Sequence, residues 1–306
     1  MRIIFMGTPD FAVASLDALL NAGFNIVAVV TAPDKPAGRG QKLQESAVKQ
    51  FAVSKGLEVL QPVKLKDPEF HEKLRSFNAD LQVVVAFRML PEAVWNMPPK
   101  GTINLHASLL PYYRGAAPIN WAVINGEKET GVTTFLLQHE IDTGNILFSE
   151  TVPIGDTETA GEVHDKLMHT GSQLLTKTVK AIEMGNYTPL AQEQIKTGLT
   201  DLPHAPKIFK EDCLINWAQP VQKVYNHIRG LSPYPAAYTI FKEKNLKIYS
   251  CEWLDKEPGI QPGGFLTDDK SYLRFACLDG FISVKEIQLE GKKRMGIEEF
   301  LRGFRS

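Results

Sequence analysis

The N-terminal part of the chain constrains the fold more than any other stretch. Ile3, Ile4 and Phe5 form an apolar run without alternation, which is typical of a parallel strand buried on both faces. An amphipathic helix is predicted over 11–21 and a second buried strand over 25–31. A strand, a helix and a strand at this spacing form a βαβ unit, which requires a parallel sheet with a right-handed crossover.

Further patterns extend this sheet. Strands are predicted over 58–60, 81–87, 103–106, 131–139 and 147–152, and helices over 46–55, 68–78, 118–125 and 158–184. The first strand is followed by Gly7-Thr8-Pro9 and not by Gly-x-Gly-x-x-Gly. The interpretation as a nicotinamide-dependent enzyme therefore lacks its main sequence motif. The predicted fold class is α/β: a Rossmann-like, mostly parallel sheet with helices on both faces.

The C-terminal third has a different pattern. After a helix predicted over 221–230, short strands are predicted over 237–241, 247–253, 264–266, 273–276 and 282–289. Their close spacing predicts a small OB-like β-barrel. A stretch rich in proline and glycine precedes it. We therefore predict a catalytic domain over 1–188, a linker over 189–206 and a C-terminal domain over 207–306.

Composition excludes several classes of protein. No apolar run approaches the roughly 20 residues of a membrane helix, so no membrane association is expected. The net charge of −1 argues against a protein that coats nucleic acid. From Lys207 onward there are 16 Lys and Arg against 13 Asp and Glu, a weak indication of a polyanionic partner. Cys213, Cys251 and Cys277 are widely spaced and odd in number, which favours a reducing cytoplasm.

One predicted strand carries a candidate site for carbonyl chemistry. Asn104 and His106 alternate with Ile103 and Leu105, so the two polar side chains share one face of the strand. Asn offers a neutral N–H donor, and His offers a donor or a base near neutral pH. The same pattern also suits a polar strand end with a buried histidine whose hydrogen bonds are satisfied.

Asp142 follows another predicted strand, in the sequence Ile-Asp-Thr-Gly. Ligands of open α/β sheets lie outside the carboxyl ends of the strands, where such loops converge. Asp142 could start a turn, or it could orient the ring of His106 and hold its charged form. His139 is a rival, and it could also be a surface histidine. No Gly-x-Ser-x-Gly elbow and no zinc-binding histidine pair occurs, so neither covalent catalysis nor a metal is expected.

The stretch from Ala32 to Leu43 is basic. Its two prolines and two glycines predict an irregular loop, and Lys35, Arg39 and Lys42 place three cations on it. Such a loop suits the approach to a phosphate backbone. The same composition also suits a solvated linker.

These motifs together resemble the 10-formyltetrahydrofolate transformylase family. The resemblance is carried by NLHASLLP (104–111), YRGAAP (113–118) and IDTG (141–144). The segments FMGTPDFA (5–12), PDKPAGRG (33–40) and IRGLSPYPAA (228–237) extend it along essentially the whole chain, toward the members that act on methionyl-tRNA. The chain departs from the family at Phe87-Arg88, where Tyr-Gly is common.

The resemblance implies transfer of a formyl group from the co-substrate 10-formyltetrahydrofolate to the methionine amine of initiator methionyl-tRNA, by a monomer. Asn104 and His106 would stabilise the tetrahedral oxyanion, and Asp142 would keep His106 charged and assist proton removal. The residues that would lie against the folate are Ser108, Leu109, Leu110 and Pro111. The residues that would reach the tRNA are Lys35, Arg39 and Lys42, and the C-terminal domain would hold the acceptor arm.

Two alternatives remain open at this point. One is a transferase or hydrolase of the same family that acts on an amino-sugar or on water. The basic loop and the basic C-terminal domain argue against it. The other is a non-catalytic RNA-binding protein with a vestigial domain, against which the intact Asn104, His106 and Asp142 argue.

Overall fold

The computed structural model describes residues 1–37, 42–198 and 200–303. The fold divides into two compact units, and both are discontinuous in sequence. The first unit comprises Met1–Arg114, Gly131–Val152 and Asp165–Pro203; the second comprises Gly115–Thr130, Pro153–His164 and His204–Ser306. Within the described residues, none of the helices combines the length and the apolar character that crossing a membrane requires.

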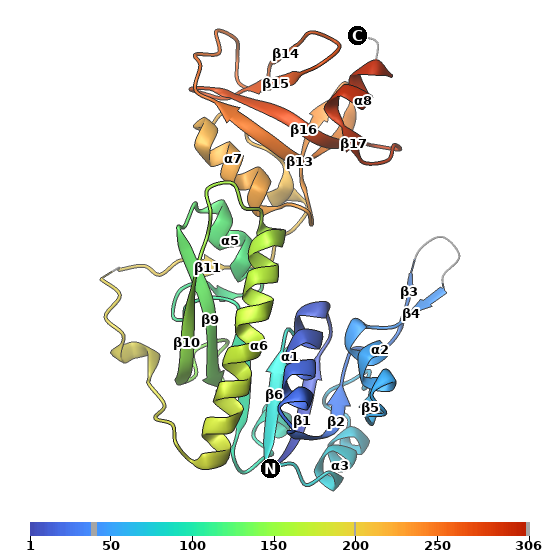
Figure 1. Cartoon of the computed structure of the whole chain (residues 1–306), viewed down its shortest axis with the longest axis vertical. Helices are drawn as coiled ribbons and strands as arrows, with labels where there is room; N and C mark the ends of the chain where they lie inside the picture. The colour runs from blue at the N-terminus through green and yellow to red at the C-terminus, as the bar shows by residue number, and fades with distance from the viewer. Residues whose placement is uncertain (38–41, 199, 304–306) are drawn as a thin grey trace. The chain divides into compact units, whose positions relative to one another are not determined.

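The first unit is built on a sheet of seven strands (Figure 1). In spatial order these are β10 (Ile146–Pro153), β9 (Glu129–Leu136), β7 (Thr102–His106), β6 (Leu81–Val85), β1 (Arg2–Gly7), β2 (Asn25–Val30) and β5 (Val59–Leu60). The strands from β7 to β5 pair in parallel, whereas β9 runs antiparallel to β7. Ile3, Ile4 and Phe5 are fully buried, and the predicted α/β class is confirmed.

Helices cover both faces of this sheet. They are α1 (Asp10–Asn21), α2 (Ala47–Ser54), α3 (Pro68–Ser76), α4 (Glu92–Trp95) and α6 (Ala160–Met184). On one face, α6 contacts Leu105 through Gly171. On the other, α3 and α4 bury apolar side chains among those of Ile4, Met6 and Val84. Because Leu105 points toward α6, its strand neighbours Asn104 and His106 point to the opposite face.

The basic stretch between β2 and α2 contains regular structure. β3 (Lys35–Ala37) and β4 (Lys42–Gln44) pair antiparallel, with Pro36 opposite Leu43. The prediction of an irregular loop over 32–43 is therefore wrong. A proline is compatible with a two-stranded ladder because each strand is an edge, and an edge position needs no N–H donor on its outer side.

The described residues of the second unit form an antiparallel sheet and several α-helices. The sheet runs β12 (Ala237–Phe241), β13 (Lys244–Leu254), β16 (Phe281–Leu289), β15 (Leu273–Ala276) and β14 (Phe265–Thr267), with β17 (Met295–Gly296) on β16. The helices are α5 (Pro118–Ile124), α7 (Val221–Gly230) and α8 (Ile297–Arg302). The sheet packs around an apolar core in which Trp217 stacks on Phe275, with 4.7 Å between the ring centroids. This half-barrel confirms the predicted small barrel domain.

Two segments from the middle of the sequence are part of this second unit. The side-chain amide of Asn120 on α5 donates to the carbonyl of Gly230 on α7 at 2.8 Å. The Arg229 guanidinium donates to the carbonyl of Glu158, also at 2.8 Å. Nearby, β8 (Arg114–Gly115) pairs with β11 (His204–Ala205). The units are thus interleaved in sequence, and the division into domains at 1–188, 189–206 and 207–306 stays a prediction.

Candidate active site

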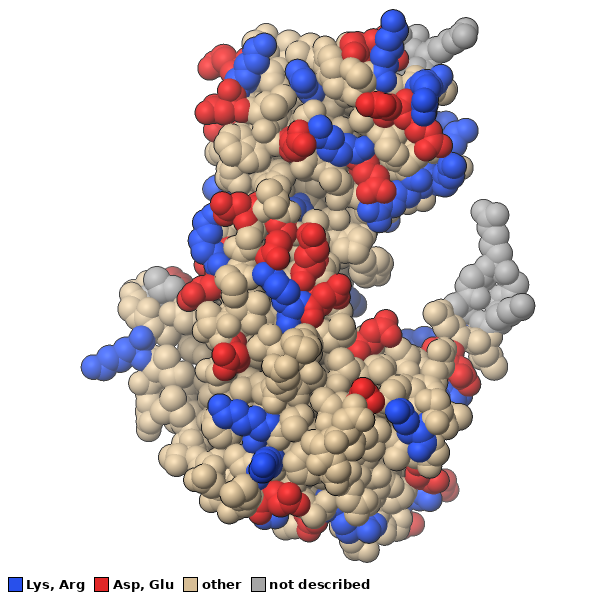
Figure 2. Space-filling model, in the orientation of Figure 1, with Lys and Arg blue, Asp and Glu red and all other residues tan. Residues whose placement is uncertain are grey.

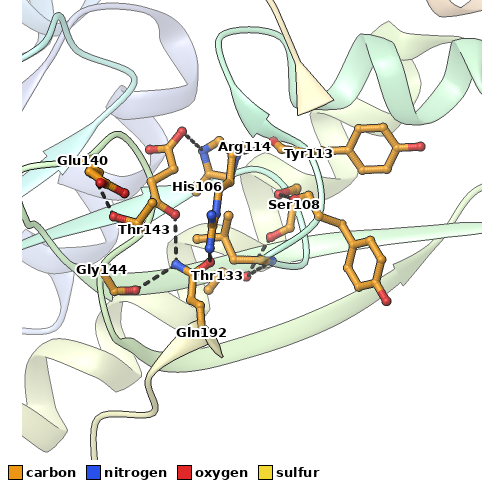
Figure 3. Close-up of polar contacts among 12 residues, drawn as sticks. His106, Ser108, Tyr113, Arg114, Thr133, Glu140, Thr143, Gly144 and Gln192 are labelled. Carbon is orange, nitrogen blue, oxygen red and sulfur yellow. Dashed lines mark hydrogen bonds and ion pairs between the residues drawn. The ribbon is translucent and has the colours of Figure 1, made fainter. Parts of the chain in front are cut away.

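His106 ends β7, and its two ring nitrogens have different partners (Figure 3). Nε2 lies 2.9 Å from the carbonyl oxygen of Tyr113. A carbonyl only accepts, so Nε2 must carry a hydrogen and donate it. Nδ1 lies 3.8 Å from Oδ2 of Asp142, and the two side chains are only 8% and 12% exposed. The ring is therefore fixed at one nitrogen, and the other nitrogen faces a carboxylate.

Asn104 is half-buried on the same strand face, two residues before His106, and pairs with Phe135 of β9.

The alternative candidate histidine, His139, lies at the protein surface. His139 is 73% exposed, with Nε2 3.3 Å from a carboxylate oxygen of Glu92 and its ring edge-on to Trp95. His139 is thus a surface residue.

The Asp142 loop (residues 140–145) follows β9 in a constrained conformation. Asp142 has φ of 56°, in the left-handed region that non-glycine residues rarely adopt. A Cβ on Gly144 would lie 1.7 Å from the carbonyl oxygen of Leu136, so only glycine fits there. Thr143 donates its hydroxyl to the Glu140 carbonyl at 3.1 Å. The Asp-Thr-Gly sequence thus has a steric origin as well as a chemical one.

Gln192, which no local pattern in the sequence singles out, contacts this loop. It opens the short 3-10 helix η1 (Gln192–Gln194), inside the stretch interpreted as a linker. Its amide nitrogen donates to the carbonyls of Asp142 and Gly144. The neighbouring Ile195 packs against an apolar cluster formed by Leu110, Phe135 and Ile146. An apolar residue within a supposed linker is the kind of signal that indicates packing.

The segment after His106 is built into the protein. Ser108, Leu110 and Pro111 are buried and Leu109 is half-buried. The Ser108 hydroxyl donates to the Tyr112 carbonyl at 2.6 Å, and the Ser108 carbonyl accepts from the Thr133 hydroxyl at 2.7 Å. The same Thr133 oxygen accepts from the Leu110 N–H at 3.1 Å. The segment is rigidly held, and its contact with folate stays a prediction.

Arg88, the departure from the family pattern, connects two loops at the carboxyl ends of strands. Its guanidinium donates to the carbonyl oxygens of Pro62 and Val63, just after β5. It also lies over the ring of Phe87, 5.5 Å from the ring centroid. Burial lowers the pKa of Arg88, although an arginine remains charged at neutral pH. Ala86, which follows β6, has φ of 47°, a second strained position at this end of the sheet.

The basic residues predicted to contact tRNA are only partly described. Lys35 is exposed on β3, Lys42 begins β4, and Arg39 lies outside the described residues. Asp34, just before β3, pairs with Lys49 and accepts from the Gln61 amide at 2.7 Å. These hydrogen bonds lower the pKa of Asp34.

Charge on the second unit is mixed in sign. On the face drawn in Figure 2, its Lys and Arg side chains lie among Asp and Glu. Several are paired, for example Lys285 with Glu252 at 2.9 Å and Arg294 with Glu286 at 2.6 Å. Over the part of the chain that the structure describes, no three His, Cys, Asp or Glu side chains are grouped so as to hold a metal ion.

Comparison with known proteins identifies the family. The formyl transferase model matches residues 1–179, and the model of the formyl transferase C-terminal domain matches 207–305. The methionyl-tRNA formyltransferase of Bacteroides fragilis is 56% identical over 309 residues, covering 99% of this chain and 95% of that protein. That of Parabacteroides distasonis is 57% identical over 311 residues, covering 100% and 96%.

Solved structures share the fold at lower identity. The N-formyltransferase from Helicobacter canadensis, solved with folinic acid and dTDP-3-aminofucose, has a TM-score of 0.69 at 20% identity and covers 96% of this chain and 100% of that one. The chain belongs to the formyl transferase family, and the two curated relatives named above, which match it over nearly its whole length, are methionyl-tRNA formyltransferases.

Proposed function

We propose that this protein transfers the formyl group of 10-formyltetrahydrofolate to the amino group of methionine on initiator methionyl-tRNA. Formyl transfer to methionyl-tRNA is supported by relatives that match the chain over its whole length. The observation that carries the chemistry is the pair of contacts made by the two ring nitrogens of His106. Its Nε2–H is committed to the Tyr113 carbonyl, and its Nδ1 faces the Asp142 carboxylate at 3.8 Å.

This arrangement suits the stabilisation of a tetrahedral intermediate. The methionine amine attacks the formyl carbon, and the carbonyl oxygen becomes an oxyanion. A charged His106 presents Nδ1–H as a donor, and Asn104 offers its side-chain N–H from the same strand face. Each positioned donor of this kind contributes roughly 3–4 kcal/mol in other enzymes.

Asp142 has two tasks in this scheme. Its carboxylate stabilises the positive charge on His106, and it assists removal of the proton that the attacking amine must lose. Collapse of the intermediate then breaks the bond between the formyl carbon and N10, N10 takes up the proton that the amine has lost, and tetrahydrofolate leaves. Because all the groups are side chains of this protein, the scheme requires no metal.

In this proposal the two substrates bind to different segments of the protein. Ser108, Leu109, Leu110 and Pro111 lie against the folate, next to the catalytic strand end. Lys35, Arg39 and Lys42 contact the acceptor end of the tRNA, and the C-terminal domain holds the acceptor arm. The protein works as a monomer in the cytoplasm, where translation begins, and light scattering at several concentrations tests the monomeric state.

The deciding experiment offers the enzyme several acceptors with 10-formyltetrahydrofolate as donor. Charged initiator tRNA, charged elongator tRNA and an amino-sugar nucleotide are compared, with mass analysis of the acceptor. Formylation of the initiator methionyl-tRNA in preference to the others is expected. Equal or better formylation of the amino-sugar, or hydrolysis alone, would overturn the proposal.

The role of the basic stretch from Ala32 to Leu43 in tRNA binding has its own test. Arg39→Ala should weaken productive tRNA binding by roughly 1–3 kcal/mol, the range for a charge-assisted contact, and the folate KM should hardly change. The loss should shrink at high salt, because phosphate contacts are already weakened there. Kinetics at two salt concentrations with saturating folate measure both effects. A variant that is silent at both would assign the loop to a solvated linker.

A further inference from the structure

Gln192 is an unusual residue in its surroundings. It lies in the stretch between α6 and β11, where proline, glycine and polar residues predominate, yet its side chain is only 2% exposed. Buried glutamine is uncommon, and its amide must find hydrogen-bond partners inside the protein. Its partners therefore indicate what the residue does.

Every polar group of the Gln192 side chain is used (Figure 3). The amide nitrogen donates to the carbonyl of Asp142 at 2.9 Å and to the carbonyl of Gly144 at 2.8 Å. The amide oxygen accepts from Nε and Nη2 of Arg114, at 3.1 and 2.6 Å. Two donors and two lone pairs are thus filled, and the amide cannot be flipped without losing all four bonds.

The two carbonyls that Gln192 holds flank Thr143, at the centre of the Asp142 loop. The loop needs such support because Asp142 has φ of 56°, a conformation that costs on the order of 1–3 kcal/mol outside glycine. Both N–H donors of Gln192 end on backbone carbonyl oxygens, not on the Asp142 carboxylate. Gln192 acts instead on the backbone that aims this carboxylate at His106.

We propose that Gln192 is a positioning residue, which holds the Asp142 loop so that the carboxylate faces Nδ1 of His106. The inference rests on the proposed function, because Asp142 matters only if His106 works as a charged donor. Glutamine is required by its two donors. A glutamate has the same shape and would still pair with Arg114, but it would present oxygens to two carbonyl oxygens.

The test uses Gln192→Glu in the full-length protein, with formylation of methionyl-tRNA as the assay. We expect kcat to fall about 10- to 100-fold, the range for a misplacement of up to about 1 Å, with both KM values within about threefold. The loss relative to wild type should shrink as the pH is lowered, because a protonated glutamate regains one O–H donor. Gln194→Glu is the matched control, since Gln194 is exposed on the same short helix.

A double variant separates positioning from a general loss of stability. In an Asp142→Asn background, Gln192→Glu should lower kcat by less than about threefold, because the group that it positions has gone. If the loss in kcat caused by Gln192→Glu is as large in the Asp142→Asn background as in the wild type, the inference is overturned. If Gln192→Glu does not fold, Arg114→Lys replaces it. The second donor to Gln192 is then removed, and kcat should fall with the same non-additivity.

The outcomes also separate this inference from the proposed function. A wild-type protein that does not formylate methionyl-tRNA would overturn both. A wild-type protein that formylates, together with a silent Gln192→Glu variant, would overturn the positioning role alone.

Discussion

Replacement of Asp142 by asparagine removes a charge while it keeps the shape of the side chain. The carboxylate lies 3.8 Å from His106 Nδ1, and both side chains are largely buried. With an effective dielectric constant of about 20, a charge pair at this separation is stabilised by about 4 kcal/mol. If that term acts in the transition state, Asp142→Asn should lower kcat about 1,000-fold.

Single-turnover formylation of methionyl-tRNA at saturating folate measures this loss without interference from product release. The melting temperature checks that the variant is folded. Asp156→Asn is the control, since it removes an exposed carboxylate whose ion pair with Lys128 is 2.5 Å long, and it should leave the rate unchanged. A folded Asp142→Asn variant that retains more than a tenth of the wild-type rate would refute the reasoning.

Three further expectations follow from packing and burial. Gly144→Ala places a Cβ 1.7 Å from the Leu136 carbonyl and should lower kcat about 100-fold through displacement of the Asp142 loop. Gly296→Ala is the control, because the added Cβ would lie 3.9 Å from the Lys285 carbonyl oxygen, and this variant should keep the wild-type kcat. Equal kcat values for the two variants would contradict this reasoning. Burial lowers the pKa of His227, so the folded state binds fewer protons than the unfolded chain, and the unfolding free energy should fall as the pH drops below about 6.5, by at most about 1.4 kcal/mol per pH unit. His227→Gln should flatten this slope in denaturant titrations between pH 6.5 and 5, and an unchanged slope would exclude His227 as its source. A fragment of residues 1–188 lacks Gln192 and should show no measurable formylation under conditions where the full chain turns over; activity within tenfold of the full chain would show that the stretch beyond 188 is dispensable.

Local patterns predicted the regular elements well. The helix predicted over 221–230 is α7, and the strands predicted over 237–241 and 273–276 are β12 and β15 with the same bounds. These elements were found because a packed helix or strand must repeat its apolar residues at its own period. The strand end that carries His106 was predicted for the same reason.

Features that depend on distant contacts were not predictable in this way. Gln192 bonds to Asp142 across 50 positions of sequence, and no local pattern records that meeting. The pairing of β3 with β4 is not predictable from composition, because two prolines and two glycines indicate irregular structure, although an edge strand tolerates proline. The strained backbone at Asp142 likewise becomes visible only in three dimensions.

The interleaving of the two units limits how such a protein can be taken apart or recombined. The backbone passes from one unit to the other five times, after residues 114, 130, 152, 164 and 203. A chimera joined at 206/207 would match a foreign α7 with the resident α5 and with Glu158, whose contacts involve Asn120 and Arg229. Exchange of the C-terminal domain between relatives therefore has to carry the 115–130 and 153–164 segments along with it. The second unit is encoded by three separate pieces of sequence, and a single crossover cannot transfer it whole.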